Sequence, residues 1–396
     1  MPPPTKRLYY ADSLLREFDA TVLESDVIDG RPVVVLDETG FYPTSGGQPF
    51  DTGRLGARRI LDVVDDDEGA IRHIVDEPIA VGERVHGVID WPRRFDHMQQ
   101  HTGQHVLSAA FDRLTGVRTV SFHLGTDDST IDLAREVTPA EIASAEAEAN
   151  RIVWEDRPVT VRFATEEEAN RLPLRKEPVK TGLLRLVDVT DFDLSACGGT
   201  HVPATGMIGI IAVTGWERFK GATRVGFACG GRALRGYGQL RDAMTAASRA
   251  LSVAPADVGP TIERLQTEMK ELTRTMRRLH EEVAAGRAER LRAEAKDIGG
   301  RRGVLRHEPG WDTVSLKTLA SAIVREPGTI AVLVGDGMPA PVVVARSGDV
   351  ELDAAAWIKR AAAELGGRGG GRPELAQGGL GVSPDRVLTF AEETLK

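Results

Sequence analysis

Two short stretches organise this chain: His101-Thr102-Gly103-Gln104-His105 and Cys197-Gly198-Gly199-Thr200-His201. Each begins and ends with a residue that can bind a metal ion, and the spacing is the same in both. Residues four apart on a helix share one face, so the two histidines of the first stretch can hold one ion together. The glycines of the second stretch allow the backbone to fold the cysteine sulfur inward.

Three imidazoles and one thiolate suit Zn²⁺ in tetrahedral coordination. We therefore predict one zinc site made of His101, His105, Cys197 and His201. Either stretch alone would be weak evidence, because two histidines at this spacing are commonly surface or core residues. The presence of both stretches in one chain favours a shared metal site over that simpler interpretation.

The bulk properties are those of a globular protein with two or three domains. The chain has 396 residues, of which 41% are hydrophobic and 28% charged. No apolar run reaches membrane-spanning length and the start lacks the core of a signal peptide, so we expect a cytoplasmic protein. In a reducing compartment its two cysteines are not expected to form a disulfide. The net charge of −9 argues against a general nucleic-acid coat but allows a local basic face.

The first 90 residues are expected to form a β-rich subdomain. Short apolar runs and alternating patterns, such as Arg84 to Asp90, are typical of strands. Between them lies Phe41-Tyr42-Pro43-Thr44-Ser45-Gly46-Gly47-Gln48, whose glycines, hydroxyls and amide can place neutral hydrogen bonds close to a ligand. A plain hairpin turn is the alternative interpretation, and composition does not decide between the two.

Residues 91–231 are expected to form an α+β domain that contains the zinc site. Trp91-Pro92 opens a helix that includes His101 and His105. A second helix is predicted from Thr138 to about Glu155, because an N-cap threonine is followed by a first-turn proline and, three residues on, a glutamate. Strands are expected around residues 121–125, 129–133, 159–163, 184–189, 208–213 and 223–229.

Residues 232–303 are expected to form a helical hairpin or coiled coil. Apolar residues follow one another at alternating steps of three and four, which indicates a heptad seam with a packing partner: Ile262, Leu265, Met269, Leu272, Met276, Leu279 and Val283. The partner could be the preceding helix or a second subunit. The outer face is basic and includes Arg274, Arg277 and Arg278. It is either a solvated face or a surface that follows phosphates.

Residues 304–396 are expected to form a small α/β module. Strands are predicted around Val314 and Leu316 and over residues 330–334 and 342–345, and helices over 353–365 and 384–394. The glycine-rich segment 366–379 is expected to be a loop. Its backbone N–H groups, together with Arg368 and Arg372, would bind an anion such as phosphate. A disordered linker is the alternative.

These motifs together resemble those of the AlaX-type alanyl-tRNA editing proteins, free-standing relatives of the editing domain of alanyl-tRNA synthetase. The matching pieces of the editing portion lie in the family's order, and with the tail the similarity extends over almost the whole chain. These pieces are residues 41–48, Asp51-Thr52-Gly53, residues 98–105, residues 121–125 and residues 197–202. The tail with its glycine-rich segment is similar to the C-terminal module of that synthetase, a domain also attached to DHH phosphoesterases.

The resemblance implies a cytosolic hydrolase that removes wrongly attached amino acids from alanine tRNA, chiefly serine, with glycine as a further substrate. It carries over His101, His105, Cys197 and His201 as the zinc ligands. It also implies that the long helices and the tail, with the arginines named above, bind tRNA and can form a homodimer. Because the chain starts directly in the editing region, we expect deacylation without aminoacylation.

The implied substrate sets a specificity problem, because a pocket that accepts serine cannot exclude the smaller alanine by size. A polar group of the pocket must therefore form a hydrogen bond with the extra hydroxyl of serine. The candidate residues for recognition and catalysis are Thr44, Gln48, Thr102 and Gln104, with Ser45 of similar chemistry. Thr44 and Thr102 are the first choice for the hydroxyl, and Gln48 for positioning water or backbone. Ordinary hydrogen bonds within a turn or a helix are the alternative for each.

Three points stay open from the residues alone. Zinc could activate water, position the substrate, or be closed and structural. His123 could be a base, but a core histidine is the favoured interpretation, and Cys229 is interpreted as a packing residue.

Two other functions are compatible with this pattern: editing of threonine tRNA, where a related zinc-type site serves, and a non-catalytic, zinc-stabilised tRNA-binding adaptor. A phosphoesterase, suggested by the tail alone, is disfavoured because the chain has no Asp-His-His triplet.

Overall fold

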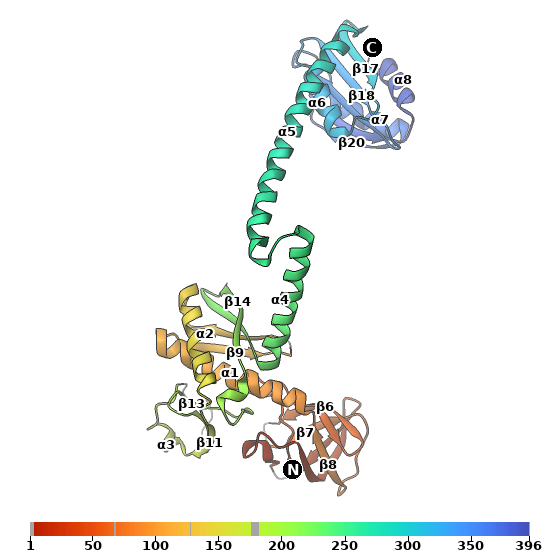
Figure 1. Ribbon diagram of the computed structural model, residues 1–396. Helices are drawn as coiled ribbons and strands as arrows, with labels where there is room; N and C mark the ends of the chain where they lie inside the picture. Colours follow the sequence, from red (N-terminus) through yellow and green to blue (C-terminus); the bar gives the residue numbers. More distant parts are fainter. Residues whose placement is uncertain (1–3, 67–68, 127, 176–181, 396) are drawn as a thin grey trace. The chain divides into compact units, whose positions relative to one another are not determined.

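The computed structural model describes residues 4–66, 69–126, 128–175 and 182–395. The chain divides into two compact units, Met1–Ala246 and Ala247–Lys396, and the course of the chain can be followed in Figure 1. Each unit has hydrophobic cores of its own. Among the described residues, no helix is both long enough and apolar enough to span a bilayer.

The first unit begins with a small closed β-barrel, which confirms the β-rich prediction for this region. Its strands close in the order β2-β3-β7-β6-β5-β8. They are β2 (Glu17–Ile28), β3 (Arg31–Leu36), β5 (Gly53–Leu55), β6 (Arg58–Asp65), β7 (Ile71–Val75) and β8 (Arg84–Ile89). Buried and exposed residues alternate along β8, as expected for a strand with one face in the core. Beside the barrel lie β1 (Lys6–Arg7), η1 (Leu8–Tyr10) and β4 (Glu38–Thr39).

Helix α1 (Trp91–Thr115) is the central element of the first unit. Asp90 caps its start by accepting a hydrogen bond from the Arg93 N–H, and Gly116, with φ of 67°, ends it in the left-handed region. The Arg94 guanidinium joins α1 to the barrel region, since its Nε donates to both Asp51 carboxylate oxygens at 3.0 Å and both side chains are 0% exposed. Loss of either partner would leave a buried charge uncompensated.

Two antiparallel sheets complete the first unit. The four-stranded sheet has the order β14-β15-β10-β9 and packs against α1 and α2. These elements are β9 (Thr119–Leu124), β10 (Ser129–Leu133), α2 (Pro139–Trp154), β14 (Ile211–Phe219) and β15 (Ala222–Cys229). The predicted capping box of α2 is confirmed. The smaller sheet comprises β11 (Val159–Ala164), β12 (Leu184–Val189) and β13 (Asp193–Ala196), with α3 (Glu166–Ala169) and η2 (Thr205–Ile208) nearby.

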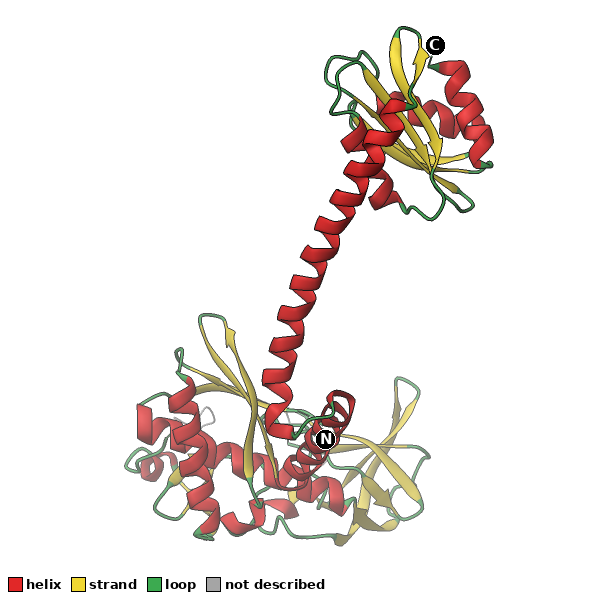
Figure 2. Ribbon diagram, turned by 45° about the horizontal axis from the view of Figure 1, so that its top comes forward, coloured by secondary structure: helices red, strands yellow, loops and turns green. Residues whose placement is uncertain are grey.

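The second unit contains a six-stranded sheet with helices on both faces (Figure 2). The strand order is β16-β17-β18-β19-β21-β20, and β18 is buried at every position, which explains its continuous apolar run. The strands are β16 (Lys296–Ile298), β17 (Arg301–His307), β18 (Thr329–Val334), β19 (Ala340–Arg346), β20 (Gly367–Gly371) and β21 (Leu375–Leu380). The helices are α5 (Val258–Ala293), α6 (Thr313–Ile323), α7 (Ala354–Leu365) and α8 (Pro384–Thr394), with η3 (Pro255–Asp257) before them.

Two sequence-based expectations for the C-terminal region are wrong. Val314 and Leu316 lie in helix α6 and not in a strand, because Asp312 caps the helix by accepting from the Ser315 N–H. The glycine-rich segment is not a loop, since β20 and β21 pair as an antiparallel edge hairpin. Glycine fits that edge because a Cβ at Gly369 would lie 2.7 Å from Cγ1 of Ile358 on α7.

The heptad seam of α5 is exposed. The exposed fractions of its side chains range from 40% at Leu265 to 69% at Met269. The buried part of α5 near its C-terminal end, with Ala284, Ala288 and Leu291, packs against α6 and the sheet. The preceding helix α4 (Gly230–Leu251) also has large exposed apolar side chains, such as Leu240 at 73%. Within the second unit, the described residues thus provide no packing partner for the seam of α5.

Helix α1 packs so closely against β15 that Gly103 has no room for a side chain. A Cβ at Gly103 would lie 2.2 Å from Sγ of Cys229. Alanine favours helices over glycine by about 1 kcal/mol, but overpacking a core costs about 1–3 kcal/mol. We expect Gly103→Ala to lower the free energy of unfolding, and a second change, Cys229→Ala, to restore part of the loss. Urea unfolding of the four proteins of this double-mutant cycle measures the coupling. If the losses in free energy of unfolding of the two single variants simply add in the double variant, the close contact between Gly103 and Cys229 would be contradicted.

Candidate metal centre

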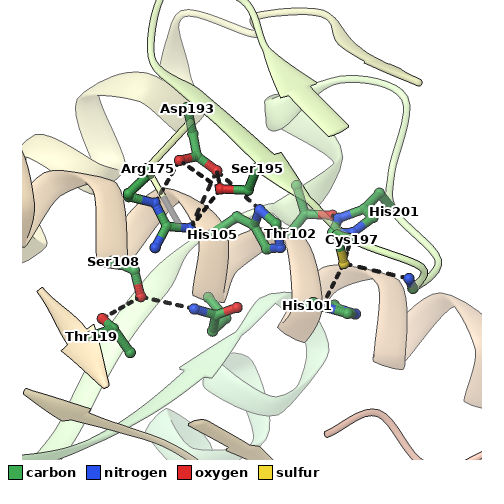
Figure 3. Close-up of polar contacts among 12 residues, drawn as sticks. His101, Thr102, His105, Ser108, Thr119, Arg175, Asp193, Ser195, Cys197 and His201 are labelled. Carbon is green, nitrogen blue, oxygen red and sulfur yellow. Dashed lines mark hydrogen bonds and ion pairs between the residues drawn. The ribbon is translucent and has the colours of Figure 1, made fainter. Parts of the chain in front are cut away.

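The structure brings the two halves of the predicted ligand set together. His101 and His105 lie one turn apart on α1, while Cys197 and His201 lie on the loop after β13. One ligand atom from each residue lies within 4.8 Å of all the others. In Figure 3, Sγ of Cys197 faces the histidines, 3.3 Å from Nε2 of both His101 and His201. Four nitrogen and sulfur donors at this separation suit one metal ion.

Two of the histidines are held through Nδ1 by groups that accept hydrogen bonds. His101 Nδ1 lies 2.8 Å from the side-chain oxygen of Gln48. His105 Nδ1 lies 3.0 Å from a carboxylate oxygen of Asp193. Because an amide oxygen and a carboxylate only accept, both Nδ1 atoms donate, and the Nε2 lone pairs are left for a metal.

The third histidine is held in the same way by a hydroxyl. Thr102 Oγ1 donates to the backbone oxygen of Met98 at 2.8 Å, so its oxygen accepts from Nδ1 of His201 at 3.2 Å and from the Val202 N–H at 3.1 Å. The residue is fully buried. Thr102 therefore fixes the orientation of His201 and has no hydroxyl proton left for a substrate.

Asp193 stands at the centre of a polar group behind His105 (Figure 3). Arg175 Nε donates to Asp193 at 2.6 Å and the Ser195 hydroxyl donates at 3.0 Å. Burial alone would raise the pKa of the Asp193 carboxyl, but His105 and Arg175 hold it well below its usual range. The buried carboxylate is thus kept anionic beside the metal ligand.

The two cysteines differ in a way that identifies the ligand. Burial would raise the pKa of the Cys197 thiol, yet the neighbouring His101 and His201 hold it well below its usual range. At Cys229, by contrast, burial in the apolar core raises the pKa of the thiol. Because the thiolate is the form that binds metals, Cys197 is the competent residue and Cys229 packs the core.

The loop that carries Cys197 is shaped by a buried arginine and by a glycine. Arg185 Nη1 donates to the backbone oxygens of Cys197 at 2.8 Å and Gly199 at 2.9 Å. A Cβ at Gly199 would lie 2.1 Å from Cε1 of His101. Any side chain at this position would therefore push the loop away from α1 and separate the ligands.

A cavity of about 370 Å³ lies beside the cluster. Three of the ligand residues, His101, His105 and Cys197, form part of its wall. Glycine backbone from the Gly46-Gly47 and Gly198-Gly199 pairs forms another part. The side chains that complete it include Tyr42, Ser45, Gln104, Thr119, Phe122 and Arg175. The cavity thus combines the metal-binding side chains with neutral hydrogen-bonding groups, two aromatic side chains and one guanidinium.

The four residues predicted for recognition and catalysis have different places. Gln104 lines the cavity. Gln48 and Thr102 are buried behind the ligands that they hold. Thr44 is exposed, accepts a hydrogen bond from the Phe50 N–H at 3.2 Å, and is not among the described residues that line the cavity.

One interpretation is wrong and three residues were missed. His123 is exposed and is not a core histidine. Asp193, Ser195 and Arg175 were not singled out from the sequence. The only available signal was the alternation of Asp193 and Ser195 on the strand before Cys197, and Arg175 had none.

The arginines predicted to bind tRNA lie in the second unit. Arg277 and Arg278 on α5 form ion pairs with Glu281 at 3.1 Å and Glu282 at 3.9 Å, and Arg274 is exposed on the same helix. Arg368 lines a separate cavity of about 590 Å³ together with glycines of the β20–β21 hairpin. Arg372 is exposed and lies outside the described lining of that cavity.

Comparison with known proteins defines the class first. Residues 184–225 match the family described as "Threonyl and Alanyl tRNA synthetase second additional domain", and residues 300–396 match the DHHA1 domain. The alanine–tRNA ligase of Pyrococcus abyssi is 36% identical over 393 residues, covering 95% of this chain. The chain spans 42% of the length of that ligase. The chain is thus a relative of alanyl-tRNA synthetase.

The particular family follows from a second relative. The alanyl-tRNA editing protein AlaX-L of Pyrococcus horikoshii is 33% identical over 410 residues, which cover 99% of this chain and 98% of that protein. This chain belongs to the AlaX-L family of alanyl-tRNA editing proteins. A solved C-Ala domain of alanyl-tRNA synthetase from Aquifex aeolicus aligns with 26% of this chain at 20% identity, with a TM-score of 0.24, which is too low to establish a shared fold.

The hydrogen bond from His101 to Gln48 predicts an effect on metal affinity. Loss of an outer partner of a ligating histidine typically weakens metal binding by about 10- to 100-fold. We therefore expect Gln48→Ala to bind Zn²⁺ more weakly by this factor in a competition titration with a chelator. Thr44→Ala is the matched control from the same segment, because its side chain is exposed, and its affinity should equal that of the wild type. Equal affinities of all three proteins would show that Gln48 does not hold the ligand.

Proposed function

We propose that this protein is a trans-editing hydrolase that cleaves the ester bond between a wrongly attached amino acid and the terminal ribose of alanine tRNA. We expect serine to be the main amino acid removed and glycine to be a second one. The observation that carries it is the cavity of about 370 Å³, which places the His/Cys cluster next to neutral hydrogen-bonding groups. The 33% identity to an alanyl-tRNA editing protein over nearly the full length of both chains supports the choice of alanine tRNA.

Zinc is the metal that these side chains fit best. His101, His105, Cys197 and His201 would hold it, since three imidazoles with fixed Nδ1 atoms and one thiolate are its preferred donors. When bound, zinc would orient and polarise the substrate or a water molecule. The outer groups Gln48, Asp193 and Thr102 would keep the histidines in position without touching the substrate.

The chain's own residues would hold the aminoacyl end of the tRNA in the cavity. The glycine backbone at Gly46-Gly47 and Gly198-Gly199 lets the ribose ester approach closely, because a wall without side chains leaves room. Ser45 and Gln104 would offer neutral hydrogen bonds to the amino acid. Such contacts can favour serine over alanine, which size alone cannot do.

Deacylation of purified seryl-tRNA and alanyl-tRNA, both made with alanine tRNA, tests the proposal. We expect release of serine well ahead of alanine. Loss of an outer-shell partner of a metal ligand lowers activity by up to about 100-fold. His105→Ala removes a ligand itself, so we expect it to lower the rate of deacylation by more than this. Circular dichroism checks that the variant is folded, and Thr44→Ala serves as the active control.

No release of serine by the wild type, with tRNA binding retained, would contradict the hydrolase proposal. That result would leave the non-catalytic, zinc-stabilised tRNA-binding adaptor as the function.

We also propose that the second unit binds the tRNA through the cavity that Arg368 lines. Peptide groups of Gly369, Gly370, Gly378 and Gly379 lie in that wall, and Thr313, the first residue of α6, is beside them. The Arg368 guanidinium, beside a wall of glycines that leaves room for a ligand, favours a phosphate group.

Substitution of the two arginines of the glycine-rich segment tests this contact. Arg368→Ala should weaken tRNA binding and reduce the slope of log affinity against log salt by about 1. Arg372→Ala, outside the cavity, should have the smaller effect. Binding measured by fluorescence anisotropy over a series of salt concentrations decides between the two, and equal effects would argue against a specific phosphate site.

The exposed seam of α5 supports a homodimer. Leucine occupies one seam position of each repeat (Leu265, Leu272 and Leu279), and Ile262, Met269, Met276 and Val283 stand at the other. Leucine at one position, with β-branched residues at both ends of the other, is compatible with a two-stranded coiled coil. We expect the wild type to sediment as a dimer and Leu272→Glu as a monomer in analytical ultracentrifugation. Lys270→Glu, off the seam, should stay dimeric. A wild-type monomer at micromolar concentration would contradict this assignment.

A further inference from the structure

Gln104 occupies a special place in the cavity wall. It lies on α1 directly before His105, is 3% exposed, and lines the cavity that His101, His105 and Cys197 also line. Its amide nitrogen donates to the Ser108 hydroxyl at 2.8 Å, and the Thr119 hydroxyl lies 2.7 Å from the same oxygen. Figure 3 shows Ser108 and Thr119 joined in this way. The amide nitrogen of Gln104 is therefore engaged by Ser108.

The amide oxygen of Gln104 is the group left over. Oε1 is buried and has no hydrogen-bond partner among the described residues. An amide oxygen only accepts hydrogen bonds, and leaving a buried acceptor unpaired is unfavourable. A ligand that enters this cavity and brings a donor to Oε1 would thus be favoured over one that does not.

We propose that Oε1 of Gln104 accepts the hydrogen bond of the seryl hydroxyl and that Gln104 is the residue that separates serine from glycine and alanine. This inference rests on the proposed editing function. Serine differs from alanine by one hydroxyl group, and an acceptor held in place by Ser108 rewards that group directly. Alanine or glycine in the cavity leaves Oε1 unpaired, so both bind with a penalty that serine avoids.

The experiment compares two substrates on wild-type and Gln104→Met protein. Methionine keeps the length of the side chain and removes the acceptor. We expect kcat/KM for seryl-tRNA to fall by about 10- to 100-fold, and kcat/KM for glycyl-tRNA, made with the same alanine tRNA, to change little. Equal losses for both substrates would overturn the inference, because Oε1 would then bind a group that serine and glycine share. A wild type that cleaves neither substrate would instead refute the proposed function itself.

Two further variants keep the test independent of folding. Gln100→Met, on the same helix, is the matched control, because both amide atoms of Gln100 are paired with the backbone of Cys229. We expect it to lower stability and leave the ratio of serine to glycine cleavage unchanged. Ser108→Ala releases the amide of Gln104 without removing it and should reduce the ratio in part. A ratio equal to that of the wild type in both Gln104→Met and Ser108→Ala would also overturn the inference.

Discussion

The hydrogen bonds of Gln48 join the three segments on which the metal cluster depends. The amide oxygen of Gln48 lies 2.8 Å from His101 Nδ1 and accepts from the Thr200 N–H at 3.2 Å, while its nitrogen donates to the Thr200 hydroxyl at 2.8 Å. One buried side chain thus connects the segment after the first barrel strands, helix α1 and the loop of Cys197. The cluster can form only if these three segments lie close together. Glycine in the segments makes that possible, because a Cβ at Gly199 would clash with His101.

A second constraint is the lack of space around α1. Gly103 lies against Cys229 on one side of the helix, and Gly199 lies against His101 on another. Both contacts are closer than any residue with a Cβ would permit. The buried ion pair of Arg94 and Asp51 anchors the first turn of the same helix. The position of the metal ligands is therefore determined by packing on several sides of α1 and not by the ligands alone.

Much of this arrangement could be predicted from local patterns, and the failures have physical causes. The spacing of the His and Cys residues and the capping box at Thr138 depend on neighbours in sequence, so both were visible. The glycine-rich segment was misread because its strands are stabilised by pairing with each other and by packing on Ile358, not by side-chain propensity. Asp193, which accepts the hydrogen bond of His105, could not be predicted because it is far from His105 in sequence. The two side chains meet only where β13 packs beside α1. In the same way, composition cannot show that Thr102 is enclosed while Gln104 faces a cavity.

X-ray absorption spectroscopy of the zinc-loaded protein tests the assignment of the metal site, because it reports the type and distance of the atoms bound to the metal. We expect one sulfur at about 2.3 Å and nitrogen donors at about 2.0–2.1 Å, with imidazole scattering. In a Cys197→Ser variant the sulfur contribution should disappear, whereas Cys229→Ser should leave it unchanged. A first shell without sulfur, or one that loses its sulfur only in the Cys229 variant, would contradict the assignment of the metal site.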